Sequence, residues 1–177
     1  MKKVLCAVLM LVLLAVCVSA WADGFLTPVF IANYGQYAEM LGVPGMTTDF
    51  DTQDKDENTT VMYYDCLSVQ SGKNDFMVKE AMLLYRFEGS RDSEMDLRAQ
   101  AFFMACTQQN STSDITMVTI GKLAKEVEPH MEALKKALTE KAEALEAGQI
   151  VFLYMDDNWA YSLFSTNGMV AIYATPM

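Results

Sequence analysis

Acidic side chains are concentrated in one stretch of the chain. The candidate ligands there are Asp49, Asp51, Asp54, Asp56 and Asn58. Clustered carboxylate and amide oxygens suit a hard cation such as calcium. The order of these residues partly follows an EF-hand loop, but its sharp turn needs glycine where Thr59 stands, and its last ligand would be Asp65 instead of glutamate. An EF-hand is therefore excluded. A looser calcium site remains a hypothesis beside a solvated acidic loop.

Acid–base chemistry has few candidate residues. Carboxylates such as Glu80, Asp65 and Asp156 could form the site of a hydrolase, and in that case they should converge in a cleft with raised pKa values. His130 is the single histidine, which excludes any site that needs two imidazoles. No Gly-x-Ser-x-Gly or Ser-x-x-Lys motif accompanies it, so we expect His130 to be a surface residue at the start of a helix. No catalytic residue and no cofactor site is assigned.

Residues 154–157 read Tyr-Met-Asp-Asp, between two strand-like segments. This box resembles the metal-binding hairpin of reverse transcriptases, in which the two aspartates hold the catalytic metal. The resemblance covers four residues, whereas the chain lacks the length of a polymerase and has no basic template channel. Acidic residues followed by asparagine are also common in turns. We therefore expect a turn here and no polymerase.

The first 22 residues have the pattern of a secretory signal peptide. Lys2 and Lys3 precede an unbroken apolar run over 4–18, and residues 20–22 supply a small-residue cleavage site. We expect cleavage after Ala22, and a protein that is periplasmic or extracellular with no membrane span. Lipidation at Cys17 is a weaker alternative, because valine precedes this cysteine where a small residue is usual.

Cleavage would leave Cys66 and Cys106 as the remaining cysteines. An exported protein meets an oxidising compartment, so two cysteines are most simply explained as one disulfide. A reactive thiol pair would normally have a Cys-x-x-Cys spacing, and these two cysteines are forty positions apart. The sequence therefore predicts a structural disulfide between Cys66 and Cys106.

Charge and length restrict the function further. Loss of Lys2 and Lys3 with the signal peptide takes the net charge from −10 to −12. Such an acidic chain is poorly suited to bind nucleic acid through its phosphates. The segment 23–177 has the length of one ordinary domain, and we expect it to form one.

The first half of this domain has clear signals for helix, loop and strand. Thr27, Pro28 and the apolar spacing that follows predict a helix over 28–41. The glycines, prolines and acidic residues of 42–60 predict a loop. Residues 61–70 are rich in β-branched and aromatic residues and predict a strand. The segment 76–87 contains good helix formers, but its place across a turn favours a hairpin partner.

In the second half, helices are expected from Ser93 to Ala105 and over 120–145, where Pro129 predicts a kink or a break. A strand over 115–120 is the alternative to an earlier helix start. Strands are expected at 150–155, 159–164 and 169–174, and Asn167-Gly168 joins the last two as a hairpin.

Together these elements predict an α+β domain, in which an antiparallel sheet of two hairpins or a meander packs against three to four helices. The function favoured by the residues is a non-enzymatic binding domain. It would bind a protein, a peptide or a small ligand through its sheet or through the acidic loop. A hydrolase and a calcium-binding protein are the alternatives.

Overall fold

The computed structural model describes residues 25–43, 49–86, 93–107, 117–166 and 168–177. Within these ranges five helices accompany one seven-stranded antiparallel sheet. The predicted α+β class is confirmed, although the sheet has more strands than two hairpins provide. The signal peptide predicted over 1–22 lies outside the described residues.

Helix α2 (Thr27–Met40) confirms the helix predicted at 28–41. Pro28 lies in its first turn, where the missing N–H costs no hydrogen bond. The capping residue is Leu26, one position earlier than predicted, because the Thr27 side chain is used elsewhere: its hydroxyl donates to Ser71 Oγ at 2.9 Å. Gly42 follows the helix with a φ of +89°, a conformation that glycine adopts without strain.

The next four strands form a meander: β1 (Asp51–Asp54), β2 (Thr59–Tyr64), β3 (Leu67–Gly72) and β4 (Val78–Arg86). Two predictions are wrong here. The loop predicted over 42–60 contains β1 and the start of β2, and the strand predicted over 61–70 is two strands with a tight turn at Asp65. That turn needs a φ of +55° at Asp65, a region that aspartate tolerates better than most residues. The strand predicted at 76–87 is confirmed.

Four helices follow: α3 (Ser93–Thr107), α4 (Met117–Glu126), α5 (Glu128–Glu140) and α6 (Ala142–Glu146). The break predicted at Pro129 is confirmed, since Pro129 lies in the first turn of α5, directly after α4 ends. The alternative strand at 115–120 is wrong for residues 117–120, which belong to α4. Residues 115 and 116 lie outside the described ranges.

The chain ends in three strands: β5 (Val151–Met155), β6 (Trp159–Thr166) and β7 (Met169–Pro176). Their predictions are confirmed, and Gly168 in the predicted hairpin has a φ of +76°. The strand order is β1-β2-β3-β4-β7-β6-β5, so the pairing of β4 with β7 joins the two halves of the sheet.

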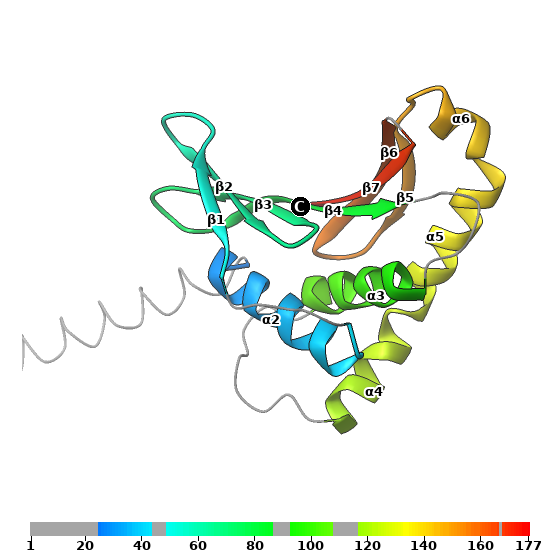
Figure 1. The fold of residues 1–177 in the computed structure, drawn as a ribbon, viewed down its shortest axis with the longest axis horizontal. Coiled ribbons are helices and arrows are strands. Elements are labelled where there is room, and N and C mark those ends of the chain that lie inside the picture. The colour runs from blue at the N-terminus through cyan, green and yellow to red at the C-terminus, as the bar shows by residue number, and fades with distance from the viewer. Residues whose placement is uncertain (1–24, 44–48, 87–92, 108–116, 167) are drawn as a thin grey trace, which may run out of the picture.

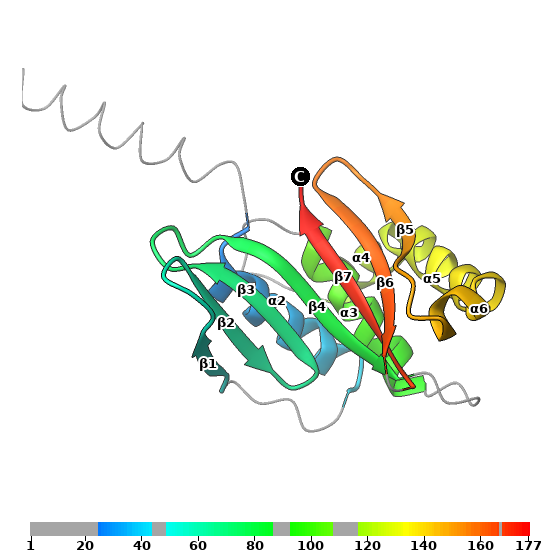
Figure 2. The same cartoon turned by 90° about the horizontal axis from the view of Figure 1, so that it is seen from above.

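All helices lie on one side of the sheet (Figures 1 and 2). Helices α2 and α3 pack side by side. Helix α2 contacts β3, α3 contacts β4, and α5 contacts β5. The core between these layers is rich in aromatic rings, with Trp159 against Phe25 and Phe30. Among the described helices, none is long and apolar enough to cross a membrane.

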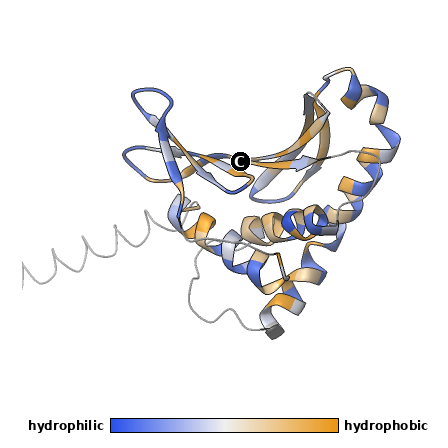
Figure 3. Ribbon diagram, in the orientation of Figure 1, coloured by the Kyte–Doolittle hydropathy of each residue, from blue (hydrophilic) through white to orange (hydrophobic). Residues whose placement is uncertain are grey.

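None of the described helices covers the opposite side of the sheet, which is called the open face below. It is concave, because the β1–β2 hairpin at one end and β6 with α6 at the other rise above the middle strands in Figure 1. The tip of the β1–β2 hairpin is strongly hydrophilic, whereas hydrophobic residues recur along the strands between the two ends (Figure 3). The sheet is therefore curved, and the tip of its β1–β2 hairpin is polar.

Candidate binding site

Strand register places one continuous row of side chains across the open face. The row crosses all seven strands, and its cross-strand partners are Asp51, Tyr63, Ser68, Met82, Tyr173, Ser162 and Phe152 in order. Directly paired residues point to the same face of a sheet. The neighbouring row, from Tyr64 through Leu83 to Val151, points to the helices and is buried. Alternation thus separates a closed core face from an exposed face.

The open face has an apolar part near its middle strands. Leu84 on β4 and Phe164 on β6 are the cross-strand neighbours of Ala171 on β7, which is buried. In the row described above, Phe152 on β5 is 63% exposed and Tyr63 on β2 is 43% exposed. Contiguous apolar groups of this kind on a surface mark interaction sites.

Beside this apolar part lies an open hollow of about 480 Å³. Tyr63, Ser68, Met82 and Tyr173 line it from the row, and Gln70 and Glu80 line it from the next positions of β3 and β4. The amide nitrogen of Gln70 donates to Glu80 Oε1 at 2.5 Å. Burial, together with the charge of Glu80, raises the pKa of the Tyr173 phenol. Asp54 and Lys55 line it as well, so the hollow combines two carboxylates, an ammonium, aromatic rings and a thioether.

The calcium candidates do not converge. Asp54 lies on the edge strand and pairs with Lys73 at 3.0 Å. Asp56 uses Oδ1 to accept hydrogen bonds from the backbone of Asn58 and Thr59, both at 2.8 Å, which forms the β1–β2 turn. These bonds lower the pKa of the Asp56 carboxyl. Asp49 and Asp51 lie where β1 begins. Within the described ranges, no group of three histidine, cysteine or acidic side chains could hold a metal ion.

The three hydrolase candidates also lie apart. Glu80 is on the open face, Asp65 is in the β2–β3 turn, and Asp156 is in the β5–β6 turn. Strand β4 is separated from β5 by β7 and β6, so Glu80 and Asp156 are about 14 Å apart across the sheet at ordinary strand spacing. These three carboxylates therefore do not form the paired arrangement that acid–base hydrolysis needs.

Asp65 belongs to a charged cluster at the end of the helical layer. The buried guanidinium of Arg98 contacts Asp65 and donates to Glu94 Oε1 at 2.8 Å. The same guanidinium lies 3.7 Å from the Cys66 sulfur, which is 3.5 Å from the Tyr34 hydroxyl. This cluster holds the β2–β3 turn against α3.

Asp156 is the centre of a second cluster. Its Oδ1 accepts the backbone N–H groups of Asn158 and Trp159, as the turn prediction for residues 154–157 requires. Its Oδ2 accepts from the Tyr161 hydroxyl at 3.2 Å and lies 3.3 Å from His130 Nε2. The aspartate is thus fully used in holding its own turn and neighbours.

The prediction that His130 is a surface residue is wrong. It does lie in the first turn of α5, but its side chain is only 7% exposed. The rings of Phe103, Tyr154 and Tyr161 surround the imidazole at centroid distances of 5.2, 4.6 and 5.1 Å. These aromatic partners come from other elements, and for this reason the local sequence around His130 did not reveal its burial.

The predicted disulfide is not present, since Cys66 and Cys106 both have free thiols. Cys66 lies beside Arg98, near the start of α3, whereas Cys106 is in the last turn of that helix. Eight residues separate Arg98 from Cys106, which is a rise of about 12 Å. Burial raises the pKa of both thiols, and Cys106 is hydrogen-bonded to Tyr161. A thiol held in this way is a poor nucleophile.

Of the residues that line the hollow, the sequence predicts Glu80 and Asp54 as site candidates, but not the aromatic and thioether side chains. Tyr63, Met82 and Tyr173 come from three strands, and 110 positions separate the first from the last. The alternation of exposed and buried residues within each strand could have assigned them to one face. Only the register between strands could bring them together.

In comparisons with family models, curated proteins and solved structures, nothing matches this chain.

Proposed function

We propose that this protein is an exported, non-enzymatic binding protein that holds a partner on the open face of its sheet. The observation that carries the proposal is the row of half-exposed and exposed side chains on a concave surface that none of the described helices covers. A sheet face that only met water would be covered mainly by charged and small polar side chains. Here Leu84, Phe164 and Phe152 also lie on it, among polar residues such as Ser68 and Ser162.

The chemistry of the described residues favours binding over catalysis. The titratable groups with buried neighbours, Arg98 and Asp156, are used in clusters that hold turns against the helical layer. The open face, in contrast, offers area, curvature and aromatic rings. Aromatic residues are enriched where proteins bind one another, because they bury a large area at little cost in side-chain entropy.

Export is supported by the residues at the beginning of the chain. The lysine pair, the apolar run and the small residues of 20–22 together have the composition of a cleaved signal. A strongly acidic mature protein with an open sheet face would remain dissolved through its charge while the face stays available to a partner.

The binding proposal can be tested by selecting random displayed peptides on the wild-type protein. Selected peptides are then measured against Leu84→Glu and Phe164→Glu. Each substitution places a charge in the apolar part of the open face. Thr139→Glu, on the exposed side of α5, adds the same charge to the helical layer and is the matched control.

We expect the two face variants to weaken binding at least tenfold, which corresponds to about 1.4 kcal/mol, while the control binds as the wild type does. Circular dichroism and thermal melting establish that all variants fold. If the selected peptides bind the face variants and the control equally well, the open face is not the binding surface and the proposal fails.

A further inference from the structure

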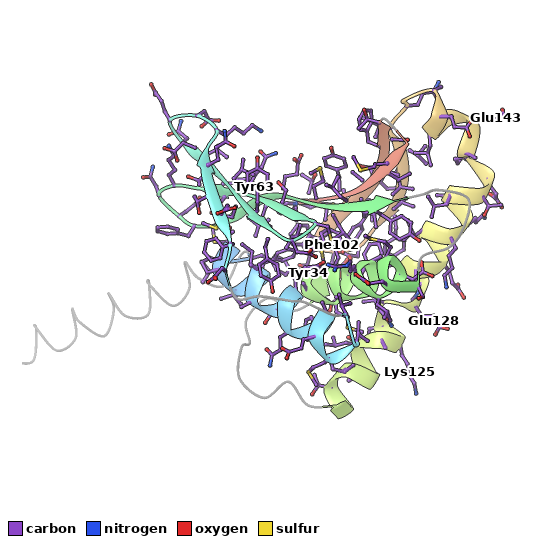
Figure 4. All side chains as sticks on the ribbon, viewed as in Figure 1. Tyr34, Tyr63, Phe102, Lys125, Glu128 and Glu143 are labelled. Atoms are coloured by element: carbon purple, nitrogen blue, oxygen red, sulfur yellow. The ribbon has the colours of Figure 1, made fainter. Side chains whose placement is uncertain are left out.

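The hollow on the open face is lined by two aromatic rings, those of Tyr63 and Tyr173. Tyr63 and Tyr173 belong to the same cross-strand row, with Ser68 and Met82 between them. Three strand spacings separate the two tyrosines, about 14 Å between their backbones. Ser68, which lies next to Tyr63 in the row, has a short side chain. Figure 4 labels Tyr63, which extends from β2 on the side away from Tyr34 and Phe102.

Glu80 lines this hollow, and a chain of hydrogen bonds fixes the position of its carboxylate. Lys55 Nζ donates to Gln70 Oε1 at 2.7 Å, and Gln70 Nε2 donates to Glu80 Oε1 at 2.5 Å. An ammonium only donates and a carboxylate only accepts, so this orientation of the Gln70 amide satisfies both neighbours. This hydrogen-bond chain uses Oε1 of Glu80, and the other carboxylate oxygen is left for a partner in the hollow.

Glu80 differs from the neighbouring acids in its charge balance. Asp54, at the edge of the hollow, is paired with Lys73 at 3.0 Å. Among the described residues, no cation pairs with Glu80, since Lys55 is bonded to the amide of Gln70 and not to the carboxylate. Glu80 is therefore a half-buried carboxylate near Tyr173 without a direct ion pair in the described part of the chain, in a hollow that Lys55 and Asp54 also line and in a protein whose net charge is −10.

We infer that this hollow receives a lysine or arginine side chain of the bound partner. The methylene stem would lie along Met82 and the tyrosine rings, and the charged end would reach the open oxygen of Glu80. Such side chains bury their stems on apolar surface and keep their charge beside a polar partner. Ring faces add attraction for a cation, and the acidic surface favours its approach. This inference rests on the proposed binding function.

The test uses two fluorescent peptides in which leucine and lysine alternate. They are identical except that the second has every lysine acetylated, which removes the charge and keeps the stem. Glu80→Gln removes the charge of the Glu80 carboxylate, and its new amide oxygen can still accept from Gln70. Glu132→Gln on the exposed side of α5 makes the same chemical change in the helical layer and serves as the matched control.

We expect the lysine peptide to bind the wild type, and Glu80→Gln to weaken it about fivefold. Glu132→Gln should leave the affinity unchanged, and the acetylated peptide should bind more weakly and show no response to Glu80→Gln. Lys55→Gln removes from the hollow a positive charge that repels the peptide lysines, and should strengthen binding of the lysine peptide about twofold. A site for anions would give the opposite sign for both Glu80 and Lys55.

The outcomes separate this inference from the binding proposal. Absence of binding by the lysine peptide, equal binding by its acetylated twin, or no response to Glu80→Gln each overturns the cationic subsite. If the lysine peptide nevertheless loses affinity for Leu84→Glu, the open face remains the binding surface. Lack of response to Leu84→Glu in both this assay and the peptide selection would reject both.

Discussion

His130 Nε2 lies 3.3 Å from Asp156 Oδ2, the oxygen that also accepts a hydrogen bond from Tyr161. This contact joins the start of α5 to the β5–β6 turn. The other imidazole nitrogen, Nδ1, is buried without a hydrogen-bond partner in the described structure. The neutral imidazole can therefore donate from Nε2 to Asp156, whereas a protonated ring would bury a second N–H at Nδ1 without an acceptor.

Stability should therefore fall as the solution is acidified through the range of this histidine. Burial outweighs the nearby Asp156 and lowers the pKa of His130 below its ordinary value. The unfolded chain, with a histidine pKa of about 6.5, then binds the proton more readily than the folded protein. The contribution of His130 is full above about pH 6.5 and is lost as the pH falls through the folded pKa.

The measurement is urea unfolding at pH 8 and pH 5 for the wild type and for His130→Phe. Phenylalanine keeps a ring among the aromatic neighbours but does not titrate. Other groups contribute to both proteins, so the difference between them isolates the histidine. An equal loss of stability on acidification in both would show that His130 does not titrate as its burial requires.

Cys66 and Cys106 should both carry free thiols, which differ in their accessibility to reagents. Cys66 is half-buried and Cys106 is buried, and burial raises the pKa of each thiol. Alkylation followed by peptide mapping should modify both in denaturant. In the folded protein we expect slow labelling of Cys66 and none of Cys106. Recovery of a peptide pair linked through Cys66 and Cys106 from a non-reducing digest would contradict the structure.

Local signals identified the helices and the last hairpin, because Pro28, Pro129 and Gly168 act within a few residues of their position. They failed for β1, an edge strand exposed on both faces, whose residues show no alternation to detect. They also failed at Asp65, where a non-glycine residue adopts a positive φ. The hollow beside Glu80 depends on the pairing of β4 with β7, a long-range property that no local pattern carries.

Arg98 should contribute substantially to stability, because its buried guanidinium holds Asp65 and Glu94 together. Arg98→Met keeps much of the side-chain volume and removes the bonds. The two carboxylates are partly exposed and can be hydrated, so we expect a loss of about 1–3 kcal/mol. Lys136→Met, which breaks an exposed pair with Glu140, is the control and should cost at most about 0.5 kcal/mol. Similar losses in chemical denaturation would mean that the Arg98 cluster contributes no more than a surface pair.

Trp159 should be among the most sensitive positions of the core. Its side chain is fully buried, its ring contacts Phe25 and Phe30, and Nε1 donates to the backbone oxygen of Cys106 at 2.8 Å. Truncation in Trp159→Ala leaves a large cavity and should cost about 3–5 kcal/mol. Trp159→Phe fills most of that space but leaves the Cys106 carbonyl without its donor, so about 1–2 kcal/mol should be lost.

Urea denaturation followed by circular dichroism measures both variants, since the substitution removes the fluorescent reporter itself. The order of the losses is the informative result. Equal stability of Trp159→Ala and the wild type would mean that β6 does not pack against α2 and α3 as described. A Trp159→Phe variant as unstable as Trp159→Ala would assign the contribution of Trp159 to its hydrogen bond with the end of α3, and not to the filling of the core.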